Sequence, residues 1–289
     1  MENENMMQFC DLHTHSIFSD GTWTPEALIA EAQKRNLGAI ALCDHNTIDG
    51  LPRFLAAAEG TDVEAIPGIE FSTQWRGIEL HIIGLFIRPE KYESIRRAMR
   101  NQQWRKDDSN RELIRQLCRL GFPLDYEKMK AATPGGHINR AHIGAELTRL
   151  GFTDSIKEAF DTLLSEKMGY YHPPERMDSL ECIRYIKELG AVAVLAHPLL
   201  TLEKELLLEF LPDAVEAGLD AMESRYVTYD EETTRTAMEI ADMFGLLHSG
   251  GSDFHGDNKP SIFLGVGKGS LQVPMSILPL LRVRQRLCE

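Results

Sequence analysis

Six of the ten histidines stand at the ends of short apolar segments, where their side chains could bind metal ions together. They are His13, His15, His45, His81, His197 and His255. A single histidine beside a strand is more often a hydrogen-bonded polar group, but packing does not explain six in equivalent places, because a buried imidazole needs partners. His13 and His15 are two residues apart, so in a strand both point to the same side and can hold one ion.

Carboxylates stand beside the same segments. They are Asp11, Asp20, Asp44, Glu70, Glu223 and Asp253. So many negative charges in one place would repel one another and raise their own pKa values, and bound cations would remove that conflict. Imidazole and carboxylate ligands without thiolates favour Mn, Zn, Fe or Co. The five cysteines are an odd number without a CxxC pair, which predicts reduced thiols rather than disulfides or a thiolate zinc site.

The apolar segments themselves predict the scaffold that positions these side chains. Each is four to seven residues long and aliphatic or β-branched, as in Ala39–Cys43 and Ala191–Ala196, which is typical of buried parallel strands. Helical stretches separate the segments: Thr24 and Pro25 begin one helix, and Ser179 is expected to cap another. This alternation predicts an α/β fold with a parallel sheet, in which the carboxyl ends of barrel strands converge on one mouth.

Residues 91–170 interrupt this rhythm and predict an all-helical insertion, or cap, between two strands of a barrel made of residues 1–90 and 171–289. The whole chain has a net charge of −13, yet residues 91–150 contain 13 Lys and Arg against 7 Asp and Glu. This basic segment is either a solvated helical surface or a positive wall that faces an anionic substrate. The overall negative charge argues against long nucleic acid held by its phosphates.

Several common signals are absent from the sequence. The first five residues are polar and acidic, unlike a signal peptide, and no apolar run reaches the roughly 18–20 residues that cross a bilayer. We therefore expect a cytoplasmic protein that does not enter a membrane. There is no Gly-x-Ser-x-Gly elbow, no P-loop and no dinucleotide-binding fingerprint. Metal-dependent chemistry is therefore favoured over covalent serine catalysis.

Five motifs, in this order and spacing, carry a family resemblance. They are His13-Thr14-His15-Ser16 with Ser19-Asp20-Gly21, Cys43-Asp44-His45-Asn46, Pro67-Gly68-Ile69-Glu70-Phe71-Ser72, Ala196-His197-Pro198 and Gly250-Gly251-Ser252-Asp253-Phe254-His255-Gly256. The pattern resembles the PHP (polymerase and histidinol phosphatase) family over nearly the whole chain, from residue 7 to about residue 267. The resemblance implies a distorted seven-stranded (β/α) TIM-like barrel that carries the helical insertion.

The resemblance also implies a site for two or three divalent ions. The first ion would be held by His13, His15, Glu70 and Asp253, the second by Glu70, His81 and His197, and the third by Asp20, His45 and His255. Mn, Zn and Fe are the expected ions, with Mg as a further candidate. All nine positions carry a suitable residue, which argues against a degenerate member of the family that has lost its metals.

Within the family, the chain resembles the phosphoesterases that act on small nucleotides, including nucleoside 3′,5′-bisphosphates, or on short oligoribonucleotides. Asn139-Arg140-Ala141-His142 is similar to a Gly-Arg-Pro-His motif that contacts substrate phosphate, although the Gly and the Pro are missing. Arg140 and His142 are therefore the expected substrate-binding residues. The expected partner is a small anionic phosphate ester or a short RNA, and not long duplex nucleic acid.

We expect water activated by the ions to attack phosphorus, while Arg140 clamps the phosphate. The expected catalytic residues are His197, His255 and Asp253, and either histidine or a metal-bound water would protonate the leaving oxygen. Asp44 is expected to orient His13 or another ligand from outside the ligand set, and Asp11 to act in the same way.

Other functions are compatible with parts of this pattern. A histidinol-phosphate phosphatase would share the ligand set and differ in its substrate. An amidohydrolase would share the His-x-His pair, but it would usually need a metal-bridging lysine after a middle strand, which we do not find. A metal-stabilised binding domain without catalysis is the alternative from another class, and metal content together with phosphatase activity would distinguish it. The sequence leaves the oligomeric state open.

Overall fold

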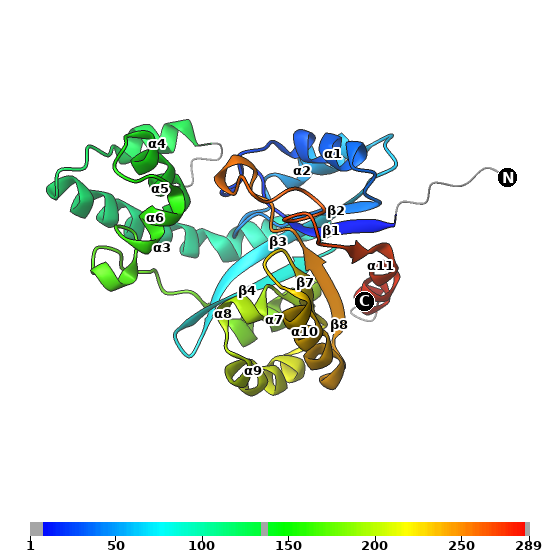
Figure 1. Cartoon of the computed structure of the whole chain (residues 1–289). Coiled ribbons are helices and arrows are strands. Elements are labelled where there is room, and N and C mark those ends of the chain that lie inside the picture. Colours follow the sequence, from blue (N-terminus) through cyan, green and yellow to red (C-terminus); the bar gives the residue numbers. More distant parts are fainter. Residues whose placement is uncertain (1–7, 134–137, 287–289) are drawn as a thin grey trace.

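A nearly closed, barrel-shaped mixed sheet forms the centre of the molecule (Figure 1). The structure, a computed structural model, describes residues 8–133 and 138–286, and only the backbone of residues 101–103. Seven main strands build the sheet: β1 (Phe9–Thr14), β2 (Ala39–Leu42), β3 (Glu64–Trp75), β4 (Ile78–Leu85), β6 (Val192–Leu195), β7 (Ala221–Tyr226) and β8 (Leu247–Gly251). The sheet order is β8-β7-β6-β4-β3-β2-β1-β9, and the two-residue strands β5 (Met177–Asp178) and β9 (Val273–Pro274) pair with β3 and β1. This agrees with the predicted fold class.

The open side of the barrel is bridged by the backbone that follows β8. The amide of Asp253 donates to the carbonyl of His13, and the amide of His15 donates to the carbonyl of Phe254, both at 2.9 Å. These two hydrogen bonds bring the last motif of the sequence against the first. They bring His13 and His15 beside Asp253 and His255 at one edge of the barrel mouth, although the two pairs are 238 or more residues apart in the sequence.

Among the seven main strands, one corrects the expectation of a wholly parallel sheet. β4 runs antiparallel to both of its neighbours, β3 and β6. Only Arg76 and Gly77 join β3 to β4, and both have positive φ, 50° and 78°. A two-residue loop of this kind makes a hairpin, whereas a parallel connection needs a dozen or more residues. The beginning of β4, rather than its end, therefore lies at the mouth, and His81 reaches the other histidines from there.

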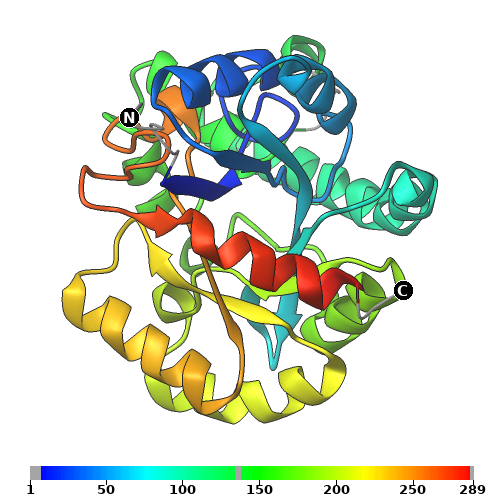
Figure 2. The same cartoon turned by 90° about the vertical axis from the view of Figure 1, so that its right-hand side faces the viewer.

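Helices surround the barrel, and the last of them lies across the end opposite the insertion (Figure 2). They are α1 (Pro25–Lys34), α2 (Leu51–Ala58), α7 (Ser179–Glu188), α8 (Pro198–Thr201), α9 (Lys204–Ala217), α10 (Glu231–Met243) and α11 (Leu278–Arg286). Thr24 caps α1 as predicted, since its hydroxyl accepts from the Ala27 amide. The predicted cap of α7 is wrong by one residue: the carboxylate of Asp178 accepts from two amides of the first turn, and Ser179 instead bonds the Thr73 hydroxyl.

The insertion between β4 and β5 contains α3 (Tyr92–Arg119), α4 (Tyr126–Ala132), α5 (Arg140–Arg149) and α6 (Ile156–Asp161), followed by a short 3-10 turn (Glu166–Met168). Its buried apolar side chains, from Leu113 to Tyr171, form a hydrophobic cluster separate from those of the barrel. Figure 1 shows these helices gathered beside the barrel, with α3 extending from it. Within the described ranges, no helix has both the length and the apolar character needed to cross a membrane.

Candidate metal centre and substrate cleft

The structure brings all nine predicted ligands to one place at the barrel mouth. His13, His15, His45, His197, Asp253 and His255 stand at or just beyond the carboxyl ends of β1, β2, β6 and β8, while Glu70 comes from β3, His81 from β4 and Asp20 from the loop before α1. The possible ligand atoms form three groups, and the atoms of each group lie within 4.8 Å of one another. The first group is His13, His15 and Glu70, the second is His45, Glu70 and His81, and the third is His15, Asp20, His45 and His255.

Glu70 stands at the centre of this cluster. Its Oε2 lies 3.3 Å from Nε2 of both His13 and His15 and 3.1 Å from Nδ1 of His45. Its Oε1 lies 2.9 Å from Nδ1 of His81 and 3.2 Å from Nε2 of His197. One buried carboxylate therefore faces five imidazoles, which is the arrangement expected of a ligand that bridges ions.

A first group of ligand atoms surrounds Oε2 of Glu70. Nε2 of His13 and Nε2 of His15 are 3.0 Å apart, and Oδ1 of Asp253 lies 3.6 Å and 3.1 Å from them. Ligands that hold an ion tetrahedrally at about 2.0–2.2 Å are separated by about 3.3–3.6 Å, so these spacings suit one ion. The predicted assignment of each ligand to a particular ion stays a prediction, because His15 and His45 each belong to two groups.

Several buried polar atoms of the cluster support the fit to metal ions. Nδ1 of His15, Nδ1 of His45, Nδ1 of His197 and Oε2 of Glu70 have no hydrogen-bond partner among the described residues. Although Oε2 of Glu70 lies close to three imidazoles, none of these contacts has hydrogen-bond geometry. Buried polar atoms are seldom left unpaired in native proteins, and cations would satisfy these.

The protonation states of His15, His45 and Glu70 also suit metal binding. Burial, together with the neighbouring His255, lowers the pKa of His15 to about 3, and burial lowers the pKa of His45 to about 4. Burial alone would raise the pKa of Glu70, but His45, His13 and His81 hold it well below its ordinary value. Neutral imidazoles and ionised carboxylates are the forms that bind cations, so these residues are ready to act as ligands.

Glu223 orients two of the predicted ligands, a role that sequence reasoning missed. Its Oε1 lies 3.0 Å from Nδ1 of His13, and its Oε2 accepts a 2.7 Å hydrogen bond from the backbone amide of His197. His197 has a left-handed backbone, with φ of 31°, which this bond helps to fix. The only sequence signal was the position of Glu223 at a strand end, because nothing in the pattern pairs it with His13.

The two carboxylates predicted for that orienting role contact other groups. Asp44 accepts from the amide and hydroxyl of Ser16 and from the hydroxyl of Ser19, each at 2.7 Å, and so shapes the loop that follows β1. Asp11 accepts from the Ser252 amide and hydroxyl, the Gly265 amide and the His13 amide. Each therefore holds backbone beside the ligands rather than a ligand imidazole.

Two neighbouring side chains hold the carboxylate oxygen of Asp253 that faces away from the imidazoles. Its Oδ2 accepts from the Tyr226 hydroxyl and from Nζ of Lys259, both at 2.7 Å. Burial alone would raise the pKa of Asp253, but Lys259 and the neighbouring histidines lower it well below its ordinary value. Oδ1 is thereby left pointing at His13 and His15, and neither Tyr226 nor Lys259 was singled out from the sequence.

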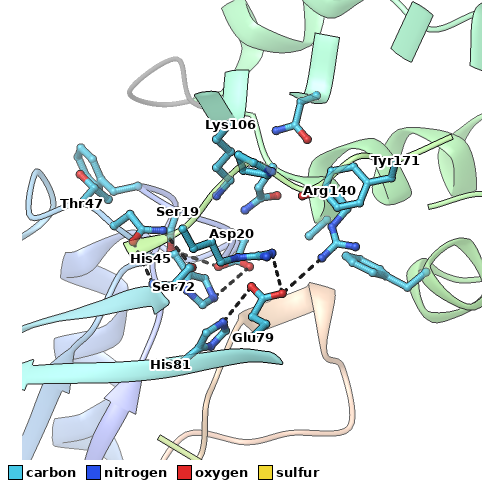
Figure 3. A pocket seen from close by; sticks show the side chains of 18 of the residues that line it. Ser19, Asp20, His45, Thr47, Ser72, Glu79, His81, Lys106, Arg140 and Tyr171 are labelled. Atoms are coloured by element: carbon cyan, nitrogen blue, oxygen red, sulfur yellow. Dashed lines mark hydrogen bonds and ion pairs between the residues drawn. The ribbon is translucent and has the colours of Figure 1, made fainter. Parts of the chain in front are cut away.

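A cleft of about 270 Å³ lies between the barrel mouth and the insertion (Figure 3). Asp20, His45 and His81 form part of its wall, so the metal cluster is open to it. The insertion side supplies three cations: Lys106 of α3, Arg140 at the start of α5, and Arg176 just before β5. Of these three, sequence reasoning singled out only Arg140.

The two predicted substrate-binding residues have different positions. The Arg140 guanidinium lies in the cleft, over the ring of Tyr171 at 4.2 Å, and its Nη2 is 4.0 Å from Oε2 of Glu79. His142 is not among the residues that line the cleft. Its Nδ1 accepts from the Asn139 amide, which completes the N-terminal cap of α5. This contact gives His142 a structural role in presenting Arg140.

Buried imidazoles and carboxylates at a barrel mouth, open to a cleft that Lys106, Arg140 and Arg176 line, are the arrangement expected of a metal-dependent phosphoesterase. The sequence profile of the PHP domain matches residues 11–171, and the chain belongs to the PHP family. It is 30% identical to a 5′-3′ exoribonuclease of Haemophilus influenzae over 93% of this chain and 97% of the relative. A 3′,5′-nucleoside bisphosphate phosphatase of Chromobacterium violaceum is 28% identical, covering 85% of this chain and 86% of the relative.

Solved structures agree with this placement. A Bifidobacterium adolescentis protein assigned as a metal-dependent phosphoesterase superposes with a TM-score of 0.84 at 27% identity, covering 95% of this chain and 96% of the other. The similarity thus spans both the barrel and the insertion, and the protein is a PHP-family phosphoesterase.

Proposed function

We propose that this enzyme hydrolyses phosphate monoesters of small nucleotides, such as nucleoside 3′,5′-bisphosphates or 5′-monophosphates, or acts on short oligoribonucleotides. The observation that carries the proposal is the position of three cationic side chains in the cleft that opens onto the cluster of expected metal ligands. The ligand cluster around Glu70 would hold cations on the barrel side, and Lys106, Arg140 and Arg176 line the insertion side. A ligand with two phosphates, or a phosphate followed by a nucleotide chain, matches such a site.

The cleft also limits the size of the substrate. A volume of about 270 Å³ lies near the lower end of small-molecule sites, which span roughly 300–1,000 Å³. This size favours one or two nucleotides in the site over a duplex. The relatives named for nucleoside bisphosphates and for ribonucleotides support the same substrate classes.

We assign the ligand roles as the sequence predicted: His13, His15, Asp20, His45, Glu70, His81, His197, Asp253 and His255 hold two or three divalent ions, with Mn, Zn or Fe as the preferred metals. Ions bound there would lower the pKa of water from about 15.7 toward about 7 and offset the charge of the phosphate oxygens. The contacts of Glu70 and the unpaired atoms beside it support this assignment.

The chain's own residues would bind the ester and deliver a proton. The planar Arg140 guanidinium, held over Tyr171, would clamp phosphate oxygens in a bidentate manner. His197, His255 and a water bound to an ion are the candidates for the proton donor to the leaving oxygen. Nδ1 of His255 lies 2.8 Å from the Asp253 carbonyl, and its Nε2 lies 3.3 Å from Oδ1 of Asp20.

We further propose that residues 91–170 act as a cap on a barrel formed by residues 1–90 and 171–289. The separate hydrophobic cluster of the insertion and its position along one wall of the cleft support this division. A cap placed in this way would select the substrate, while the barrel would supply the metal chemistry.

A phosphate-release assay with the Mn²⁺-loaded enzyme tests the proposal. We expect faster release from a nucleoside 3′,5′-bisphosphate and from a short 5′-phosphorylated oligoribonucleotide than from histidinol phosphate. Faster release from histidinol phosphate would favour the alternative phosphatase. No release from any ester by a protein that binds metal tightly would favour a non-catalytic binding domain.

A further inference from the structure

Glu79 connects the metal centre to the insertion. Glu79 and His81 are two residues apart in β4 and lie on the same face of the strand. Oε1 of Glu79 lies 3.4 Å from Nε2 of His81, whose Nδ1 lies 2.9 Å from Oε1 of Glu70. Oε2 of Glu79 accepts a 2.7 Å hydrogen bond from Arg176, which also lines the cleft. The His81 imidazole is thus placed between two carboxylates, one central and one at the cleft wall.

This geometry is the one by which proteins orient metal-binding histidines. A ligand imidazole usually donates its second ring N–H to a carboxylate or carbonyl, which fixes the orientation of the ring and makes it a stronger ligand. Glu223 has the same relationship to His13, but its other oxygen bonds a barrel amide. Glu79 differs because its other oxygen is held by a cation from the segment that returns from the insertion.

The charges around Glu79 make this contact strong. Arg176 is largely buried, and Arg140 lies 4.0 Å away on the same side. One oxygen of Glu79 faces His81 and the other faces the two arginines, so a change at the cleft wall can be transmitted through this carboxylate to the His81 ring.

We propose that Glu79 is a positioning residue through which the segment that follows the insertion controls metal affinity: Arg176 holds Glu79, and Glu79 holds His81. The proposal rests on the metal-binding role of His81 in the proposed function. It means that a cleft residue that touches no ligand still contributes to metal binding. It also means that a phosphate bound to Arg176 would compete with Glu79 for the same guanidinium.

Calorimetric titration of metal-free, full-length protein with Mn²⁺ tests this coupling. Glu79→Gln should weaken Mn²⁺ binding by about 10- to 100-fold, the usual effect of losing such a partner. Arg176→Met should also weaken binding, to a smaller extent, and should have no further effect in the Glu79→Gln background. The matched control is Arg105→Met, because Arg105 pairs at 2.6 Å with Glu175, beside the same cleft, rather than with Glu79.

The direction in which Arg176→Met changes the Mn²⁺ affinity distinguishes this proposal from a direct charge effect of Arg176 on the metal ions. Removing a positive charge near a cation site should tighten metal binding by Coulomb's law. Tighter binding in Arg176→Met, no change, or an equal change in both backgrounds would overturn the coupling. If Glu79→Gln does not fold, weaker binding in Arg176→Met than in Arg105→Met still supports it, and equal binding refutes it. Failure of the wild type to bind Mn²⁺ would instead refute the proposed function.

Discussion

Nδ1 of His13 lies 3.0 Å from Oε1 of Glu223, although the two residues are 210 positions apart in the sequence. Both side chains are fully buried. Because the other oxygen of Glu223 accepts from the His197 amide, this one carboxylate joins the ends of β1, β6 and β7 beneath the metal centre. Burial alone would lower the pKa of His13, but Glu223, Glu70 and Asp253 raise it well above its ordinary value.

Glu223→Gln should weaken metal binding without direct loss of a ligand. The amide keeps the size of the side chain but removes the charge that strengthens His13, and we expect a decrease in Mn²⁺ affinity of about 10- to 100-fold. Calorimetric titration of the metal-free protein measures it. Glu216→Gln, on the exposed side of α9, is the control. Equal affinities of the two variants would show that Glu223 does not orient the ligands.

Replacing Arg140 should impair substrate binding and leave the metal centre intact. A charge-assisted hydrogen bond contributes about 1.5–3 kcal/mol, so Arg140→Glu should lower kcat/KM by at least about tenfold and raise KM. Arg140→Lys should lie between this variant and the wild type, because lysine keeps the charge but loses the planar stacking on Tyr171. Steady-state kinetics with a nucleoside 3′,5′-bisphosphate measure both. Unchanged KM and kcat/KM in Arg140→Glu would refute the phosphate clamp.

Lys106 should give substrate binding an alkaline limit. Burial lowers the pKa of Lys106 below its ordinary value of 10.5. A lysine loses its charge as the pH rises through its pKa, so the attraction for an anionic phosphate should weaken at a lower pH than for a free lysine. KM should therefore rise on the alkaline side, at a pH below 10.5. Lys106→Met should have a higher KM at neutral pH and lack this rise, and the same rise in Lys106→Met would assign the titration to another group.

Gly251 should tolerate no side chain. A Cβ atom there would lie 2.4 Å from the Cβ and 2.5 Å from the backbone nitrogen of His13, and backbone cannot move aside as a flexible side chain can. Gly251→Ala should lower the free energy of unfolding by about 1–3 kcal/mol or more and weaken Mn²⁺ binding, because it separates β8 from β1. Urea unfolding measures the first effect. The control is Gly144→Ala in α5, where the nearest atoms are side chains at 3.3 Å or more. Equal stability of the two variants would contradict this close approach.

Most of the ligand residues could be singled out because they stand at the ends of apolar segments, and the family resemblance added Asp20 and implied the full ligand set. The direction of β4 could not be predicted in this way, since the apolar pattern is the same in parallel and antiparallel strands. Its signal was the two-residue Arg76-Gly77 turn, whose positive φ angles fit a hairpin. His81 was therefore assigned to the mouth correctly, although the strand that carries it runs in the opposite direction.

The cleft wall was less predictable than the metal centre. The basic character of the insertion was visible in the sequence, but not which of its cations face the substrate. Arg96 and Arg105 pair with exposed carboxylates, Asp49 and Glu175, while Lys106 and Arg176 line the cleft. Such a distinction depends on which side of a helix or loop meets the barrel, and this is decided by packing between distant segments.

The most direct test of metal-dependent hydrolysis at the Glu70 cluster is phosphate release from a nucleoside 3′,5′-bisphosphate by chelator-stripped protein, with and without added Mn²⁺. We predict no release by the stripped protein, full recovery with Mn²⁺, and no recovery in Glu70→Gln, because this residue faces five imidazoles of the cluster. Equal release by stripped and Mn²⁺-loaded protein, or full activity of Glu70→Gln, would contradict the account.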